Sequence, residues 1–356
     1  MAGLAEIARA AGVSVSTVSR VLNGRAGVNE ETRRRVLSVV AEMPYTARGL
    51  GALQRTGVIA LLVPELSNPV FPAFAEALEV RASRAGYACL LCNTRAGTRR
   101  PDGDVLGRAM GEEEYVRMLL ARGVAGMVFV SPEISNPSSD RPPRHYRTLL
   151  DEGVPTVFVN GGAPTLDVPD FAVDEQLAGY LATRHLVELG HERIGFVCGP
   201  ARSLPARLKR VGWQTALEEA GLPTPAELVA HAPFGPEGGA AALAELLDRP
   251  DPRHRPTGVI CSSDHMALGV LREARRRGLD VPGRLSVVGF DDIPLAACCA
   301  PALTTLAQPI EEMAAAAIDE LVRRLVPGTA QGGGSRGHST LFRPRLVVRE
   351  STAPPG

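Results

Sequence analysis

A short segment near the N-terminus carries polar side chains whose spacing places them on one face of a helix. The segment is GVSVSTVSRVLNG, residues 12–24. On a helix, Val18, Val21 and Leu22 would share one face and point inward. The opposite face would carry small hydrogen-bonding groups and one guanidinium, from Ser16, Ser19, Arg20 and Asn23. Such a face can bond phosphates and base edges, and arginine can make a bidentate contact to guanine. An ordinary capped surface helix would show the same pattern, so this chemistry alone leaves both interpretations open.

The residues around this segment predict a helix-turn-helix unit. The apolar spacing in LAEIARAAGVS predicts a first helix, and Gly12 can adopt the left-handed conformation that a sharp turn requires. Ser14 is a suitable N-cap for a second helix that runs to about Leu22, and Asn29 for a third helix over about residues 30–43. Three short helices with a tight first turn are typical of this motif.

Charge is unevenly distributed along a chain with no formal net charge. Residues 1–57 hold eight Arg and four Glu, a balance of +4, so the remainder carries −4. A basic N-terminal segment suggests an anionic partner. No segment approaches the ~18 consecutive apolar residues of a membrane span, and the N-terminus has no basic segment followed by an apolar run. We therefore expect a cytoplasmic protein without a membrane partner.

The rest of the chain alternates short apolar runs with helical patterns. VIALLV, ACLLC, GMVFV and TVFV form one series, and RIGFVC, GVIC and SVVGF form a second. Buried strands that alternate with helices indicate the α/β class with parallel sheets. Two series suggest two lobes, with a ligand site between them at the C-terminal ends of the strands.

The remaining polar residues form no catalytic or metal-binding pattern. Cys89 and Cys92 flank Leu-Leu in ACLLC, which indicates a buried strand, so we expect core thiols rather than metal ligands. The sequence lacks G-x-x-x-x-G-K-[ST], and its seven histidines lack metal-ligand spacing. The patterns G-x-G-x-x-G and G-x-S-x-G occur only within GGGSRG, residues 332–337, which belongs to a low-complexity segment. We therefore expect neither enzyme activity nor a cofactor. Segment 136–145, NPSSDRPPRH, is expected to form an exposed loop.

Several long segments, in order along the chain, resemble the LacI/GalR family of bacterial repressors. They are LAEIARAAGVSVSTVSRVLNG (4–24), VPELSNPVF (63–71), HLVELGHERIGFVCGP (185–200), SSDHMALGVL (262–271), LSVVGFDDIPLA (285–296) and PALTTLAQP (301–309). The regulatory body of that family is similar to periplasmic sugar-binding proteins. The resemblance implies a sequence-specific DNA-binding repressor whose operator affinity is controlled by a small molecule, with a sugar or glycoside as the expected effector. The alternative is a binding protein or enzyme on the same scaffold, and a transport binding protein would have a signal peptide in place of the N-terminal head.

The resemblance also implies a division into domains. The expected parts are a helix-turn-helix DNA-binding domain at 1–45, a hinge linker at 46–57 and an effector-binding regulatory domain at 58–356. The regulatory domain is expected to contain an N-lobe of about 58–159 with 293–326 and a C-lobe of about 160–292 with 327–350.

Roles in DNA binding follow from the same resemblance. It implies that Val15, Ser16 and Arg20 read bases. It implies phosphate contacts for Ser14, Thr17, Ser19 and Asn23. It further implies a homodimer on a pseudo-palindromic operator, because a symmetric dimer reads two half-sites.

The hinge departs from the family pattern. The segment YTARGLGALQRTG, residues 45–57, contains no proline and has glycines at positions 49 and 51. Gly49 and Gly51 would each cost a helix ~1 kcal/mol relative to alanine. Leu53 is the expected side chain for insertion into the minor groove, with Leu50 as the alternative.

The resemblance implies a set of effector contacts, most of them just after a predicted strand. They are Asn68, Phe71, Asn160, Lys209, Phe234, Ser263, Asp291 and Gln308. For Phe71, a core position at a helix start is an equally good interpretation, and we expect Asp264 to cap the following helix. Lys209 is the only lysine among 39 basic residues. Because an ammonium is more compact than a guanidinium, we expect Lys209 to pair with Asp291 in the empty cleft and with ligand oxygens in the occupied one.

Overall fold

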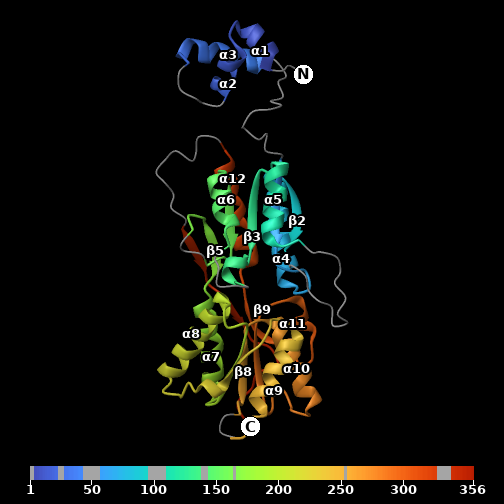
Figure 1. The fold of residues 1–356 in the computed structure, drawn as a ribbon. Helices are drawn as coiled ribbons and strands as arrows, with labels where there is room; N and C mark the ends of the chain where they lie inside the picture. Colours follow the sequence, from blue (N-terminus) through green and yellow to red (C-terminus); the bar gives the residue numbers. More distant parts are fainter. Residues whose placement is uncertain are drawn as a thin grey trace. The chain divides into compact units, whose positions relative to one another are not determined.

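The chain divides into two units in the computed structural model, Met1–Thr56 and Gly57–Gly356 (Figure 1). The structure describes residues 4–22, 28–42, 57–94, 110–137, 143–162, 166–251, 255–326 and 338–356. Within these ranges, no helix combines the length and the apolar character that crossing a membrane would require.

The N-terminal unit contains the predicted three helices. They are α1 (Leu4–Ala11), α2 (Val15–Leu22) and α3 (Glu30–Glu42). Gly12 has a φ of 64° and makes the tight turn between α1 and α2, as its lack of a Cβ allows. Ile7, Val18 and Val36 are fully buried and join the three helices in one small core. The sequence pattern therefore predicted this unit correctly.

Two local caps start the second and third helices as expected. The Ser14 hydroxyl accepts a hydrogen bond from the Thr17 amide at 3.1 Å. The Asn29 side chain accepts one from the Thr32 amide at 2.8 Å. Each cap satisfies an amide that has no partner within its helix, which fixes where the helix begins.

The second unit contains two six-stranded sheets, each the centre of one lobe. The N-lobe sheet has the order β11-β5-β4-β3-β1-β2 and is parallel throughout. Its strands are β1 (Val58–Val63), β2 (Ala88–Asn93), β3 (Gly126–Val130), β4 (Thr156–Val159), β5 (Asp170–Val173) and β11 (Ser339–Phe342). The C-lobe sheet has the order β12-β10-β9-β8-β6-β7 and is parallel except for β12. Its strands are β6 (Ile194–Cys198), β7 (Val229–His231), β8 (Gly258–Cys261), β9 (Ser286–Asp291), β10 (Thr304–Ala307) and β12 (Arg345–Val347).

Helices pack on both sheets, as expected for parallel strands joined by crossovers. Those of the N-lobe are α4 (Val70–Arg84), α5 (Glu112–Arg122), α6 (His145–Asp151) and α12 (Ile310–Leu325). Those of the C-lobe are α7 (Glu175–Glu188), α8 (Leu204–Glu219), α9 (Pro236–Leu247), α10 (Asp264–Arg276) and α11 (Pro294–Cys298). Two short 3₁₀ turns lie at Glu133–Ser135 and Ala226–Leu228. Helices α7 and α8 pack against each other, as do α9 and α10.

The division between the lobes differs from the expected one at three strands. Strand β5 pairs with β4 in the N-lobe, although its residues were assigned to the C-lobe. Strand β10 pairs with β9 in the C-lobe, and β11 pairs with β5 in the N-lobe, each opposite to the expectation. The chain therefore crosses between lobes after β5, after β10 and between β11 and β12. Pairing with distant strands decides which sheet a short strand joins, and a local apolar pattern does not contain that information.

Strand β2 was expected to be buried, and this prediction was wrong. Its Leu90 and Leu91 side chains are 37% and 44% exposed. The reason is position, because β2 is an edge strand that pairs only with β1 in its sheet. Of the two cysteines, Cys92 is buried and Cys89 is half-buried, and both are free thiols.

Candidate functional site

The exposed face of α2 carries the polar groups predicted from the sequence. Ser16 and Arg20 are exposed, and Val15 is 45% exposed despite being apolar. On the other side, Val18 and Val21 are buried in the core of the unit. The helix therefore presents a methyl-bearing residue, a hydroxyl and a guanidinium on one surface.

Hydrogen bonds among the side chains organise the N-terminal end of this face. The Ser14 hydroxyl lies 2.8 Å from the Ser16 hydroxyl and 2.8 Å from the Thr17 hydroxyl. This places three hydroxyls at the N-terminal end of a helix, where a phosphate is favoured. Other predicted DNA contacts lie outside the described residues: Asn23, the hinge leucine Leu53 with its alternative Leu50, and the Ser19 side chain.

A cleft of about 450 Å³ lies between the two lobes of the second unit. All eight expected effector contacts line it: Asn68, Phe71, Asn160, Lys209, Phe234, Ser263, Asp291 and Gln308. They come from both lobes and from the crossover after β10. Phe234 is 38% exposed and packs on Gly199, while Asn68 is buried and accepts a long hydrogen bond of 3.4 Å from the Val70 amide.

The strands that end at the cleft do so with an unusual backbone. Ser131, Asn160 and Asp291 follow or end β3, β4 and β9, and their φ values are 49°, 55° and 122°. Positive φ is uncommon outside glycine and costs roughly 1–3 kcal/mol per residue. All three residues line the cleft. The fold thus keeps the backbone of three polar residues at strand ends in a conformation that an unfolded chain would rarely adopt.

A chain of hydrogen bonds between amide and carboxyl groups crosses the cleft floor. The Val173 amide donates to Asn160 Oδ1 at 2.9 Å, which fixes the side chain of Asn160. Asn160 Nδ2 donates to Gln308 Oε1 at 3.0 Å, and Gln308 Nε2 donates to Asp291 Oδ1 at 2.7 Å. Because Asn160 belongs to the N-lobe and Asp291 to the C-lobe, Gln308 joins the two lobes at this point.

The expected pairing of Lys209 with Asp291 was wrong. Lys209 Nζ instead forms an ion pair with Glu175 Oε2, and it lies 3.7 Å from the centre of the Phe290 ring. Lys209 is 4% exposed and Glu175 is 8% exposed. Asp291 has Gln308 as its hydrogen-bond partner. Burial raises the pKa of Glu175, and Lys209 opposes that rise.

Glu175 is a cleft residue that the sequence did not predict. It is the first residue of α7, directly after the N-cap Asp174, whose side chain accepts from the Leu177 amide at 2.9 Å. The segment DFAV before it is a strand that ends at the crossover between lobes. Recognition of that short strand would have placed Glu175 at the cleft.

Glu112 is a second residue that the sequence did not predict, and its partners correct another expectation. It is the first residue of α5 and is buried. Its carboxylate accepts from the Tyr146 hydroxyl, lies 2.8 Å from His145 Nε2 and accepts from the Glu133 amide at 3.1 Å. His145 was expected in an exposed loop but is buried. The interaction with Glu112 supplies the polar partner that a buried imidazole needs.

The expected cap of α10 was wrong: Ser263, which lines the cleft as expected, caps this helix in place of Asp264. Ser263 is the N-cap of α10, and its hydroxyl accepts from the Met266 amide at 3.2 Å. The Asp264 carboxylate accepts from the Ile293 amide at 2.9 Å and from the Thr305 hydroxyl at 2.5 Å. Burial raises the pKa of Asp264 to about 6. Asp264 therefore ties α10 to the segments that follow β9 and β10.

The pKa of Asp291 rises well above its usual range for a related reason. Burial is the main cause, the Asp264 carboxyl adds to it, and Lys209 opposes it. Asp291 is 7% exposed, so water screens its charge poorly. Negative charge on Asp291 itself is therefore unfavourable at this position in the cleft.

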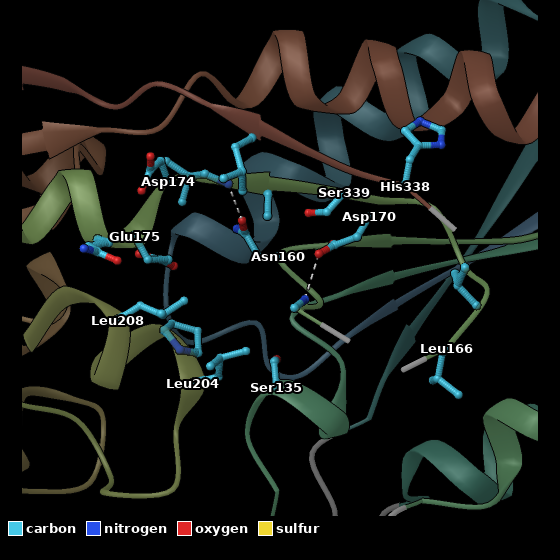
Figure 2. Close-up of a pocket in the computed structure, with 17 residues that line it drawn as sticks. Ser135, Asn160, Leu166, Asp170, Asp174, Glu175, Leu204, Leu208, His338 and Ser339 are labelled. Carbon is cyan, nitrogen blue, oxygen red and sulfur yellow. Dashed lines mark hydrogen bonds between the residues drawn. The ribbon is translucent and has the colours of Figure 1, made fainter. Parts of the chain in front are cut away.

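A second, smaller cavity adjoins the cleft (Figure 2). Its volume is about 330 Å³, and it shares Asn160, Glu175 and Pro205 with the cleft. Figure 2 shows Leu204 and Leu208 of α8 facing this cavity, and most of its lining is apolar. The sequence did not predict it, because it depends on where β5 and β11 pair.

Two family models match this chain. Residues 3–47 match the model described as bacterial regulatory proteins of the lacI family. Residues 183–352 match a periplasmic binding protein-like domain. The first match lies on α1 to α3, and the second covers most of the C-lobe together with α12 and β11 of the N-lobe.

Known proteins resemble the chain along nearly its whole length. It is 41% identical over 356 residues to the transcriptional regulator MalR of Streptomyces coelicolor, covering 98% of this chain and 96% of that protein. The structure of a transcriptional regulator CelR in complex with cellobiose is 30% identical, with a TM-score of 0.69 over 99% of this chain and 100% of that one. The lac repressor dimer bound to operator and the anti-inducer ONPF is 25% identical, with a TM-score of 0.67 and 98% of each chain covered.

These matches decide between the two functions considered for the sequence, and they favour a transcriptional regulator over a transport binding protein or an enzyme on the same scaffold. The separation rests on the N-terminal match together with the full-length identity to a regulator. The chain therefore belongs to the LacI family and is a DNA-binding transcriptional regulator.

Proposed function

We propose that this regulator is a cytoplasmic repressor that binds its operator as a homodimer and whose operator affinity is controlled by a sugar or glycoside in the cleft. The observation that carries the proposal is the cleft itself, which collects all eight expected effector contacts from two lobes and a crossover. The cellobiose in the CelR complex and the operator-bound lac repressor dimer support the sugar and the dimer respectively. The expected domain division, with a hinge linker between head and body, forms part of the same proposal.

Roles in the head follow from the surface of α2. Val15, Ser16 and Arg20 would contact base edges in the major groove, because they form its exposed face. Phosphate contacts are proposed for the polar residues at and beyond this face: Ser14, Thr17, Ser19 and Asn23. Leu53 is proposed for the minor groove.

Replacing Arg20 with alanine tests the proposed base readout. We expect operator affinity to fall by ~1–3 kcal/mol at a guanine-containing position, with a relaxed preference there, because the bidentate contact is lost. Operator selection followed by binding assays would measure both effects. Arg34→Ala is the matched control, since it removes the same charge from the exposed part of α3. The control should weaken binding without changing base preference, and an unaltered preference in Arg20→Ala would remove that residue from base readout.

Roles in the cleft follow from the chemistry of its side chains. Asn68, Asn160, Gln308 and Ser263 offer polar groups to sugar hydroxyls, and Asp291 can accept two of them. Phe71 and Phe234 can cover the apolar faces of a sugar ring. Lys209 is proposed to act on the ligand from its position between Glu175 and the Phe290 ring.

A thermal-shift screen of sugars and nucleosides tests the effector class. A bound sugar at about 100 times its Kd should stabilise the protein by ~2.7 kcal/mol, because ligand binds only the folded state. The Asp291→Asn variant should lose most of this shift, since one acceptor oxygen becomes a donor. A panel in which nucleosides stabilise the protein and sugars do not would overturn the sugar assignment.

A further inference from the structure

The cleft is strongly biased toward acidic side chains. Its lining includes five carboxyl groups, from Glu65, Glu112, Glu133, Glu175 and Asp291. Among the described residues that line it, Lys209 is the only Lys or Arg. This bias does not follow from composition, because the chain has equal numbers of acidic and basic residues, 39 of each. Basic side chains elsewhere on the protein are plentiful, yet the described cleft lining contains no arginine.

The single cation is already engaged. Lys209 Nζ forms an ion pair with Glu175 and lies over the Phe290 ring at 3.7 Å. Both contacts are with buried groups, and the lysine is 4% exposed. A ligand phosphate would have to compete with Glu175 for the ammonium and would leave that carboxylate buried without its partner.

Hydrogen bonds fix the side chains of two of the other acids. Glu112 is held by Tyr146 and His145, and Asp291 is held by Gln308 Nε2. The buried carboxyl groups of Glu175 and Asp291 repel one another, and this makes the site unfavourable for a further anion and favourable for hydroxyl donors. Sugar hydroxyls can donate to these oxygens, whereas phosphate and carboxylate groups of a ligand cannot.

We infer that the cleft selects against negative charge, so that its ligand is a hydroxyl-rich molecule without an anionic group. We expect sugar phosphates, sugar acids and nucleotides to bind more weakly than the corresponding neutral molecules. The inference rests on the proposed function and narrows it from sugars in general to those that carry no negative charge. Two features would disfavour an anionic ligand: the five carboxyl groups of the lining, and the ion pair that Lys209 already forms with Glu175.

Calorimetric titration of the full-length protein with matched pairs tests this inference directly. The pairs are glucose with glucose 6-phosphate, ribose with ribose 5-phosphate, and cellobiose with cellobionate, all at one pH and one ionic strength. We expect at least one neutral sugar to bind and its anionic partner to bind at least ~10-fold more weakly. Glucosamine, which is cationic, should bind no more weakly than glucose. An anion that binds as tightly as its neutral parent, or binds where the parent does not, would overturn the inference.

The two proposals fail in different ways. If a phosphorylated sugar binds best, a sugar effector stands and charge selection falls. If none of the sugars or their anionic derivatives binds, the sugar effector itself falls, and the inference that rests on it falls too.

Glu175→Gln identifies the source of the selection. The isosteric change removes one carboxylate and frees the Lys209 ammonium, so the ratio of neutral to anionic affinity should narrow by about tenfold. Glu188→Gln is the matched control, because it removes a carboxylate from the exposed end of the same helix, where Glu188 pairs with Arg184. The control should keep the wild-type ratio. A wild-type ratio in Glu175→Gln, with neutral-sugar affinity retained, would contradict the inference.

Discussion

Replacing Lys209 with methionine is expected to lower the free energy of unfolding by ~3–5 kcal/mol, because it leaves the Glu175 carboxylate buried without its ion-pair partner. Both side chains are less than one tenth exposed, so water cannot take over the role of the ammonium. Methionine retains most of the apolar length that packs near Phe290. Trp213, the only tryptophan, lies one turn further along α8 and is buried, so its fluorescence during urea unfolding reports on this lobe.

Two further variants show whether the buried charge is the cause. The double variant Lys209→Met with Glu175→Gln should recover most of the lost stability, since the remaining group is neutral. Arg184→Met breaks the exposed pair with Glu188 on the neighbouring helix and should cost less than ~1 kcal/mol. If the double variant is as unstable as Lys209→Met alone, loss of packing rather than an unpaired carboxylate explains the effect.

Lys209→Arg is expected to weaken ligand binding despite keeping the charge. The guanidinium is wider and planar, and the ammonium is enclosed by Glu175 and the Phe290 ring. Operator affinity without ligand should stay unchanged for this variant.

Replacing Gly179 with alanine is expected to destabilise the C-lobe by about 3 kcal/mol and to weaken ligand binding about tenfold. A Cβ on Gly179 would lie 2.0 Å from the backbone oxygen of Lys209, well inside van der Waals contact. On the opposite helix, a Cβ on Gly212 would lie 1.9 Å from the backbone oxygen of Gln176. Helices α7 and α8 thus approach closely through these two glycines, and an added methyl group must move Lys209 away from Glu175.

Urea unfolding and calorimetric titration with a neutral sugar would measure the two effects of Gly179→Ala. Gly57→Ala is the matched control, because a Cβ there meets nothing within 4 Å and the φ is not positive. Its stability should stay within ~1 kcal/mol of wild type. Wild-type stability in Gly179→Ala would show that the helices can separate at little cost and that their close approach does not fix the cleft.

Local signals in the sequence determined the head and the central strands, while the individual cleft residues were assigned from the resemblance to the LacI/GalR family. Gly12, Ser14 and Asn29 act through the conformation of their own residue or through a bond three residues away, so they could be identified without a tertiary structure. Apolar runs located the central strands in the same way. Because parallel strands end at one edge of a sheet, polar residues that follow them, such as Asn160 and Asp291, could be assigned to one cleft.

The tertiary structure alone decided which sheet each late strand joined and which charges met. Strands β5, β10 and β11 lie in sheets that their sequence neighbours did not indicate, and Leu90 is exposed on β2, which lies at the edge of the described sheet. Lys209 forms its ion pair with Glu175 and not with Asp291, because the crossover after β5 brings the start of α7 to the cleft. Pairing of strands and of buried charges depends on contacts between residues distant in the chain. Capping and periodicity depend on neighbours, which is why the sequence determined the elements and the fold determined their partners.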